Sequence, residues 1–132
     1  MKVLVVDDHA LMRAMIRELI AHLSPEVREC ASGEEAIQAC GNFRPDIVTM
    51  DLQMKGMDGL TALRLIRAIH PHSHLVVVTE YDGHALRQRA QSAGADHFVM
   101  KDQLLDLRRH LENYEAVRQA ADRSEDAAGQ KH

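Results

Sequence analysis

Four short apolar runs in this chain are each followed directly by one or two residues with an acidic, hydroxyl or amino side chain. This repetition constrains the fold more than any other feature. In chain order the runs and their polar residues are VLVV before Asp7 and Asp8, DIVTM before Asp51, LVVV before Thr79, and FVM before Lys101. Continuous apolar runs are typical of strands that are buried on both faces of a parallel sheet. Since the carboxyl ends of parallel strands meet at one edge, we expect these polar residues to converge there.

The rest of the sequence alternates between strand-like and helix-like patterns. We expect strands at residues 2–6, 27–31, 46–50, 75–79 and 97–100, and helices at 10–23, after Ser32, after Asp58, at 84–93 and from about Asp102. Strands that alternate with helices form a parallel sheet covered on both faces. The sequence therefore predicts an α/β fold, a doubly wound five-stranded parallel sheet with five helices. The polar strand 27–31 is expected at a sheet edge.

Capping residues support two of these helices, and apolar content indicates how firmly the fourth helix is packed. Ser32 and Glu35 fit a capping box, and Asp58 fits the cap of the next helix. The helix at 84–93 has Leu86 as its only large apolar residue, so it buries little apolar area. We expect this fourth helix to be the least stable element and the one most able to shift.

Composition excludes several classes of function. The formal net charge of −4 argues against direct binding to nucleic acid, which needs a basic surface. The apolar run before Asp7 is too short for a signal peptide or a membrane span, so we expect a cytoplasmic protein. Cys30 and Cys40 lack CxxC or zinc-type spacing, and we expect two reduced thiols without a redox role.

The polar residues at the strand ends predict a particular chemistry. Carboxylates held a few ångströms apart repel one another unless a cation lies between them. Oxygen ligands select Mg²⁺-like ions, which keep some water and share phosphate oxygens. An ammonium and a hydroxyl beside such an ion suit a phosphoryl group.

Asp7-Asp8, Asp51, Thr79 and Lys101, in this order at strand ends, resemble the receiver domain of bacterial two-component response regulators. The stretches VLVVDDHALMR, ASGEEA and DLQMKGMDG add to the likeness, which covers residues 2 to about 115. VLVVDDHALMR is most similar to receivers that precede DNA-binding output domains. The resemblance implies a flavodoxin-like sheet with strand order 2-1-3-4-5.

The resemblance also implies roles for individual residues. Asp51 would accept a phosphoryl group from a histidine kinase or a histidine phosphotransfer protein. Asp8, Asp51 and the backbone carbonyl of Gln53 would contact Mg²⁺, and Asp7 would reach the ion through water. Lys101 and Thr79 would bind the phosphoryl group, and Thr79 and Phe98 would form the switch. The chain would then be no enzyme beyond catalysing its own phosphorylation and dephosphorylation.

Each of these residues also has a purely structural interpretation. Asp7 and Asp8 fit the start of the first helix, where acidic groups are favoured. Phe98 fits a core position, and Lys101 fits a solvated surface charge. The joint occurrence of all of them at strand ends, in family order, favours the functional interpretation.

Departures from the family pattern affect the site. Lys55 replaces the usual proline after the acceptor, which loosens the turn. Glu80 replaces a small residue after Thr79, and its charge repels an incoming phosphoryl group. Glu80 therefore supports an alternative, a degenerate receiver that docks proteins without phosphorylation.

Gln53 and Tyr81 hold positions that, in this family, tune the rate of phosphoaspartate hydrolysis, and the bulk of Tyr81 predicts a shielded, long-lived phosphoaspartate. A hydrolase of the dehalogenase type is disfavoured because it needs D-x-D where this chain has DDH.

The end of the sequence bears on output. We expect a receiver domain at residues 1–120 and a polar, disordered tail at 121–132, with signalling through the face formed by the fourth helix, fifth strand and fifth helix. The last helix has an apolar stripe formed by Leu104, Leu107 and Leu111. Either this helix packs on the sheet and then frays, or it continues into a short coiled coil that would make a homodimer. His70, His72 and His74 are expected in a surface loop without a metal.

Overall fold

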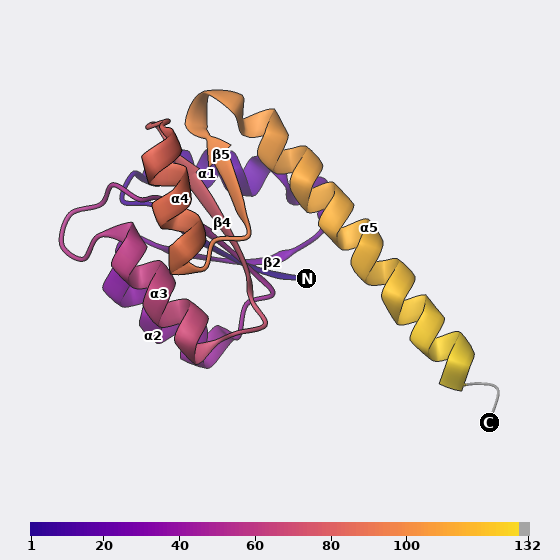
Figure 1. Ribbon diagram of the computed structural model, residues 1–132. Helices are drawn as coiled ribbons and strands as arrows, with labels where there is room; N and C mark the ends of the chain where they lie inside the picture. Colours follow the sequence, from indigo (N-terminus) through magenta and orange to yellow (C-terminus); the bar gives the residue numbers. More distant parts are fainter. Residues whose placement is uncertain (130–132) are drawn as a thin grey trace.

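The computed structural model describes the backbone of residues 1–129 and the side chains of residues 1–125. Five parallel strands form one sheet in the order β2-β1-β3-β4-β5, which confirms the predicted topology (Figure 1). The strands are β1 (Lys2–Val6), β2 (Glu26–Cys30), β3 (Ile47–Met50), β4 (His74–Thr79) and β5 (His97–Met100). Each begins within one residue of its predicted position. The carboxyl ends of β1, β3, β4 and β5 share one edge of the sheet.

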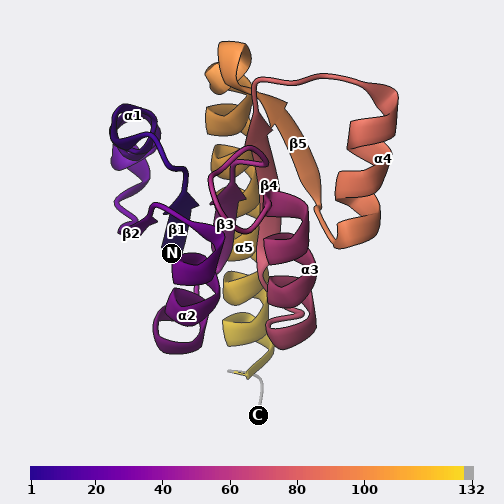
Figure 2. The same ribbon diagram turned by 90° about the vertical axis from the view of Figure 1, so that its left-hand side faces the viewer.

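Helices cover both faces of the sheet (Figure 2). They are α1 (Ala10–Leu19), α2 (Gly33–Phe43), α3 (Gly59–Ile69), α4 (His84–Ala93) and α5 (Leu104–Gly129), with single 3₁₀ turns at Ala21–Leu23 and Lys101–Gln103. One core lies under α1 and α5, where Ile16, Ile20, Leu107 and Leu111 are buried. A second core lies under α2, α3 and α4. The predicted first helix ran to Leu23, but its last turn tightens into the 3₁₀ turn and closes at Ser24 in a left-handed conformation.

The predicted caps are largely present. Ser32 Oγ accepts from the Glu35 backbone amide at 3.2 Å, although Glu35 bonds the amide of Ala31 rather than that of Ser32. Asp58 Oδ1 accepts from the Thr61 amide at 3.0 Å and fixes the start of α3. Gly59 is required there because a Cβ atom would lie 2.4 Å from the carbonyl oxygen of Asp51. The Asp58-Gly59 pair therefore packs α3 directly beneath the carboxyl end of β3.

Two elements are thinly packed, as their sequences predict. β2 lies at the sheet edge, with only Cys30 buried. On α4 the buried residues are Ala90 and Ala93, while Leu86 is only partly buried. Little apolar area therefore holds α4 against the sheet.

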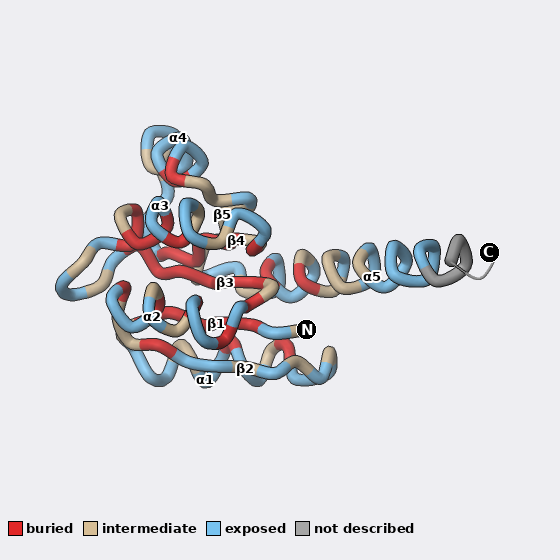
Figure 3. The backbone as a smooth tube through the Cα atoms, turned by 90° about the horizontal axis from the view of Figure 1, so that it is seen from below, coloured by how far each residue is buried: buried red, intermediate tan, exposed pale blue. Residues whose placement is uncertain are grey.

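The sequence predicted a disordered tail from residue 121, whereas in the structure α5 continues to Gly129 and residues 121–129 are helical. Residues 130–132 lie outside the described part. Three of the residues 121–129 are alanine, the strongest helix former. Figure 3 shows that the buried positions of α5 lie in its first turns while its later turns are mostly exposed, and Figure 1 shows the helix running past the body of the domain.

His74 lies in β4 rather than in a surface loop, which corrects the sequence prediction. Its Nε2 is 2.7 Å from Nε2 of His110, and the His110 ring stacks on His97 with 3.8 Å between centroids. These three rings, from β4, α5 and β5, are called the histidine stack below. Contact between α5 and the strands creates this cluster, which sequence spacing cannot reveal.

Two further observations concern the helices and the cysteines. Among the described residues, none of the helices combines the length and apolar character that a membrane crossing requires. Cys30 and Cys40 are both buried free thiols. Burial raises the pKa of each to about 11, so neither has the thiolate character of a reactive cysteine.

Candidate functional site

Three carboxylates meet at the carboxyl edge of the sheet, as predicted. Asp7 and Asp8 follow β1, and Asp51 follows β3, and the three are called the acidic pocket below. Asp7 and Asp51 are 1% and 2% exposed, respectively. One oxygen from each carboxylate lies within 4.8 Å of the others. Like charges this close and this well buried disfavour ionisation unless a cation offsets them.

Lys101 is the cation that the fold itself supplies. Its Nζ lies 2.8 Å from Asp7 Oδ2 and 3.3 Å from Asp51 Oδ2, and its side chain is buried at the end of β5. Burial acts to lower the pKa of Lys101, but the ion pairs with the two carboxylates outweigh it and raise that pKa overall. Lys101 is therefore a permanent ammonium that offsets part of the charge of the acidic pocket.

The charge of the acidic pocket is only partly compensated. Burial raises the pKa of Asp51, and the nearby Asp7 adds to this, although the Gln53 amide and Lys101 act in the opposite direction. Asp8 Oδ1 is buried and, within the described residues, accepts no hydrogen bond of good geometry, although His9 Nδ1 lies 2.9 Å away. A buried oxygen without a well-aligned donor and a carboxylate with a raised pKa both fit a missing positive charge. The all-oxygen carboxylate set suits Mg²⁺.

A small cavity of about 70 Å³ opens onto Asp51. It is lined by His9, Asp51, Gln53, Glu80, Tyr81 and Lys101. This volume holds a few water molecules or one phosphoryl group. Glu80 and Tyr81 are exposed at the rim, as expected from their places after Thr79. The backbone amide of Gln53 donates to Asp51 Oδ1 at 3.1 Å and orients the carboxylate toward the cavity.

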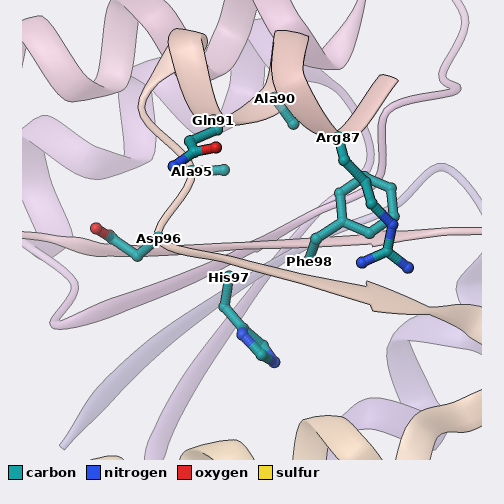
Figure 4. A pocket seen from close by; sticks show the side chains of 7 residues that line it. All are labelled: Arg87, Ala90, Gln91, Ala95, Asp96, His97 and Phe98. Atoms are coloured by element: carbon teal, nitrogen blue, oxygen red, sulfur yellow. The ribbon is translucent and has the colours of Figure 1, made fainter. Parts of the chain in front are cut away.

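The predicted switch residues lie apart from this cavity. Thr79 is buried at the end of β4, and its hydroxyl accepts from the Tyr81 amide at 3.4 Å. Among the described residues it makes no hydrogen bond to Asp51. Phe98 is partly exposed, and the guanidinium carbon of Arg87 lies 4.6 Å from its ring centre. Figure 4 shows Arg87 over the Phe98 ring, beside a pocket of about 320 Å³ between α4 and β5.

The sequence interpretation overlooked two residues at the site. His9 joins the acidic pocket, with Nδ1 2.9 Å from Asp8 Oδ1. Glu34 on α2 accepts from the Met57 amide at 3.1 Å and so ties down the loop that carries Lys55. The histidine of DDH is visible in the sequence, but nothing local marks Glu34, because its partner is 23 residues away. Lys55 itself is exposed and, in the described residues, forms no ion pair.

Comparisons with known proteins agree with this geometry. The profile of the response regulator receiver domain family matches residues 3–122. The chemotaxis protein CheY of Thermotoga maritima is 38% identical over 101 residues, which cover 76% of this chain and 84% of that protein. The response regulator GacA of Pseudomonas syringae is 37% identical over 102 residues, but the match spans only 48% of its length. Among solved structures, a LuxR-family response regulator from Aurantimonas has a TM-score of 0.80 at 32% identity, covering 87% of this chain and 84% of that one.

Proposed function

The chain belongs to the response regulator receiver domain family, and we propose that it accepts a phosphoryl group on Asp51 from a histidine kinase or a histidine phosphotransfer protein. The observation that carries this proposal is the position of Asp51. Its carboxylate is buried at the floor of a cavity the size of one phosphoryl group, beside a buried ammonium. Such a carboxylate can act as a nucleophile only toward a group small enough to enter.

Transfer needs little covalent chemistry from the protein. An oxygen of Asp51 bonds to phosphorus as the phosphorus–nitrogen bond of a phosphohistidine breaks, and the bonding electron pair stays on the imidazole nitrogen. The Gln53 amide holds Asp51 Oδ1, while Lys101 approaches Oδ2. These contacts fix the carboxylate in place before transfer, and positioning is the main contribution a protein makes to phosphoryl transfer.

Positive charge at the site supports the same step. Lys101 is placed to pair with a phosphoryl oxygen once the phosphoryl group is on Asp51. Asp8, Asp51 and the carbonyl of Gln53 would hold Mg²⁺, with Asp7 behind them, and this ion would neutralise charge on the transferring group.

Phosphorylation would act on the thinly packed side of the fold. The Thr79 hydroxyl would give up its hydrogen bond with the Tyr81 amide and bond a phosphoryl oxygen instead. This change would pull on the loop that leads into α4. Phe98 could then turn inward from its place beneath Arg87. Because α4 buries little apolar area, a change worth a few kcal/mol can move it. A downstream protein would read this change on the surface formed by α4, β5 and α5.

A second candidate is a docking module that works without phosphorylation. Glu80 lines the cavity and places a carboxylate where the phosphoryl group must pass. Its charge disfavours an anionic donor and would slow transfer or restrict it to one partner. The exposed turns of α5 offer such a module, or a second copy of the chain, a further contact surface.

The test uses a small phosphodonor, so that no cognate kinase is needed. Protein is incubated with acetyl phosphate and Mg²⁺, and intact mass is compared for wild type, Asp51→Asn and Asp58→Asn. Asp58 is a matched control because it is an exposed acid nearby whose carboxylate only caps α3. We expect a hydroxylamine-sensitive phosphoryl adduct in wild type and Asp58→Asn, and none in Asp51→Asn.

An equal adduct in Asp51→Asn would contradict the proposal. Folded wild type that gains no adduct, yet pulls down the same partner as Asp51→Asn, would establish the docking module instead. The adduct's lifetime tests Tyr81 separately: a half-life of only seconds contradicts the shielding that its bulk predicts.

A further inference from the structure

His9 places a nitrogen ligand inside the acidic pocket. Its Nδ1 lies 2.9 Å from Asp8 Oδ1 and 3.2 Å from Asp7 Oδ1. This nitrogen and one oxygen from each of Asp7, Asp8 and Asp51 all lie within 4.8 Å of one another. The imidazole ring is 69% exposed, so it turns toward the carboxylates without being forced there by packing.

The backbone fixes where His9 stands. Its amide donates to Asp7 Oδ1 at 2.8 Å, and Arg13 Nη1 donates to the Asp7 carbonyl at 2.7 Å. These two bonds hold the turn between β1 and α1. His9 occupies the residue before α1 but makes no side-chain bond that caps the helix. Its ring is therefore free of a structural duty at the helix start and remains available to a ligand.

A nitrogen ligand changes which ion the acidic pocket prefers. Carboxylate and carbonyl oxygens suit both Mg²⁺ and Mn²⁺, whereas an imidazole adds affinity for first-row transition dications and little for Mg²⁺. We propose that His9 is a metal ligand of the acidic pocket and raises its affinity for a transition dication such as Mn²⁺ relative to that for Mg²⁺. This inference rests on the metal site of the proposed function and names the ion that the site selects.

The competing explanation is that His9 only pairs with Asp7 and Asp8. An ion pair of this kind alters the charge of the acidic pocket for every dication alike. A ligand bond instead acts on ions that accept nitrogen and spares Mg²⁺. The ratio of the two affinities therefore separates the explanations, while either affinity alone does not.

The experiment measures the Kd of Mn²⁺ from the electron paramagnetic resonance signal of the free ion, and the Kd of Mg²⁺ by competition. Wild type is compared with His9→Ala and with His22→Ala, a histidine that pairs with Glu112. We expect His9→Ala to weaken Mn²⁺ roughly tenfold and Mg²⁺ by about twofold or less. Nitrogen-14 couplings in the electron spin-echo spectrum of bound Mn²⁺ should appear in wild type and His22→Ala and vanish in His9→Ala.

Equal weakening of both ions by His9→Ala, or nitrogen-14 couplings that survive it, would overturn the inference. Asp8→Asn distinguishes this failure from a failure of the proposed function. If Asp8→Asn weakens both ions while His9→Ala does not change their ratio, the metal site stands and only the role of His9 falls. If Asp8→Asn weakens neither ion, the acidic pocket is not the metal site and both proposals lose their basis.

Discussion

The acidic pocket and the histidine stack both gather three ionisable side chains, but they resolve the problem of like charge in opposite ways. The three rings of the histidine stack pack on one another and share a hydrogen bond between His74 and His110. Burial first, and then the neighbouring imidazoles, lower the pKa of His110 to about 4. Burial also lowers the pKa of His74 and His97. All three rings are therefore neutral at pH 7.

The acidic pocket keeps its charge instead. It holds one ammonium against three carboxylates, includes a buried oxygen whose nearest donor, His9, is poorly aligned, and raises the pKa of Asp51. The histidine stack is neutral, so it contributes to packing. The acidic pocket keeps excess negative charge, so it is suited to bind a cation and a phosphoryl group. The difference between satisfied and unsatisfied charge separates the structural cluster from the functional one.

The sharpest way to break this contrast is to remove the ammonium from the acidic pocket. Lys101→Met leaves Asp7 and Asp51 buried without their ion pair, so the free energy of unfolding should fall by about 3 kcal/mol in metal-free buffer. Urea denaturation measures this loss. Added Mg²⁺ should restore part of it, and Lys55→Met, at an exposed lysine, should change stability little. A neutral effect of Lys101→Met would show that the pocket is not charged as described.

The histidine stack predicts an acid-labile fold. Because the pKa of His110 falls from 6.5 when unfolded to about 4 when folded, the unfolded chain binds the extra proton between these values. Stability is thus complete above pH 6.5 and is lost as pH falls toward 4, by up to about 2 kcal/mol after allowance for partial exposure. Denaturation curves at pH 7, 6 and 5 measure the slope, and His110→Gln should flatten it. An unchanged slope in this variant would place the acid sensitivity elsewhere.

Two matched substitutions compare an unsatisfied acid with a satisfied one. The raised pKa of Asp51 means that its charge opposes folding at every pH above its ordinary value of 3.8. Asp51→Asn should therefore stabilise the metal-free protein, by about 1 kcal/mol. Asp58→Asn should destabilise it slightly, since hydrogen bonds from Thr61 lower the pKa of that exposed cap while asparagine caps a helix about as well as aspartate. Thermal unfolding in EDTA gives both signs, and two shifts of the same sign would contradict the contrast.

The smallest expected effect concerns Arg87, which covers the predicted switch residue Phe98. Its guanidinium covers Phe98 and is held by Asp82 at 2.9 Å, and this holds the ring outward. A cation–π contact of this exposed kind is worth about 0.5–1 kcal/mol. Arg87→Ala should therefore tighten the binding of beryllofluoride with Mg²⁺ by about two- to fivefold. Titration followed by NMR of the Phe98 ring measures the change, and equal or weaker binding would show that Arg87 does not hold the switch.

The fold and the acidic pocket could be predicted from sequence because both depend on short apolar runs and on the polar residues at their carboxyl ends. Asp7, Asp51 and Lys101 lie together because strand direction alone sends their side chains to one edge. The histidine stack could not be predicted, since His74 and His110 are 36 residues apart and meet only through the docking of α5. The helical continuation through residues 121–129 was not predicted because the polarity of this segment suggested disorder, although three of its residues are alanine.

The most direct test of the account is the effect of Mg²⁺ on thermal stability. The unsatisfied charge of the acidic pocket predicts that Mg²⁺ raises the unfolding midpoint of wild type, with about 2.7 kcal/mol gained at one hundred times the Kd. Asp8→Asn combined with Asp51→Asn should abolish this gain, while His110→Gln should keep it in full. A midpoint that Mg²⁺ leaves unchanged in wild type, or raises equally in the doubly substituted protein, would contradict the claim that these carboxylates form the cation site.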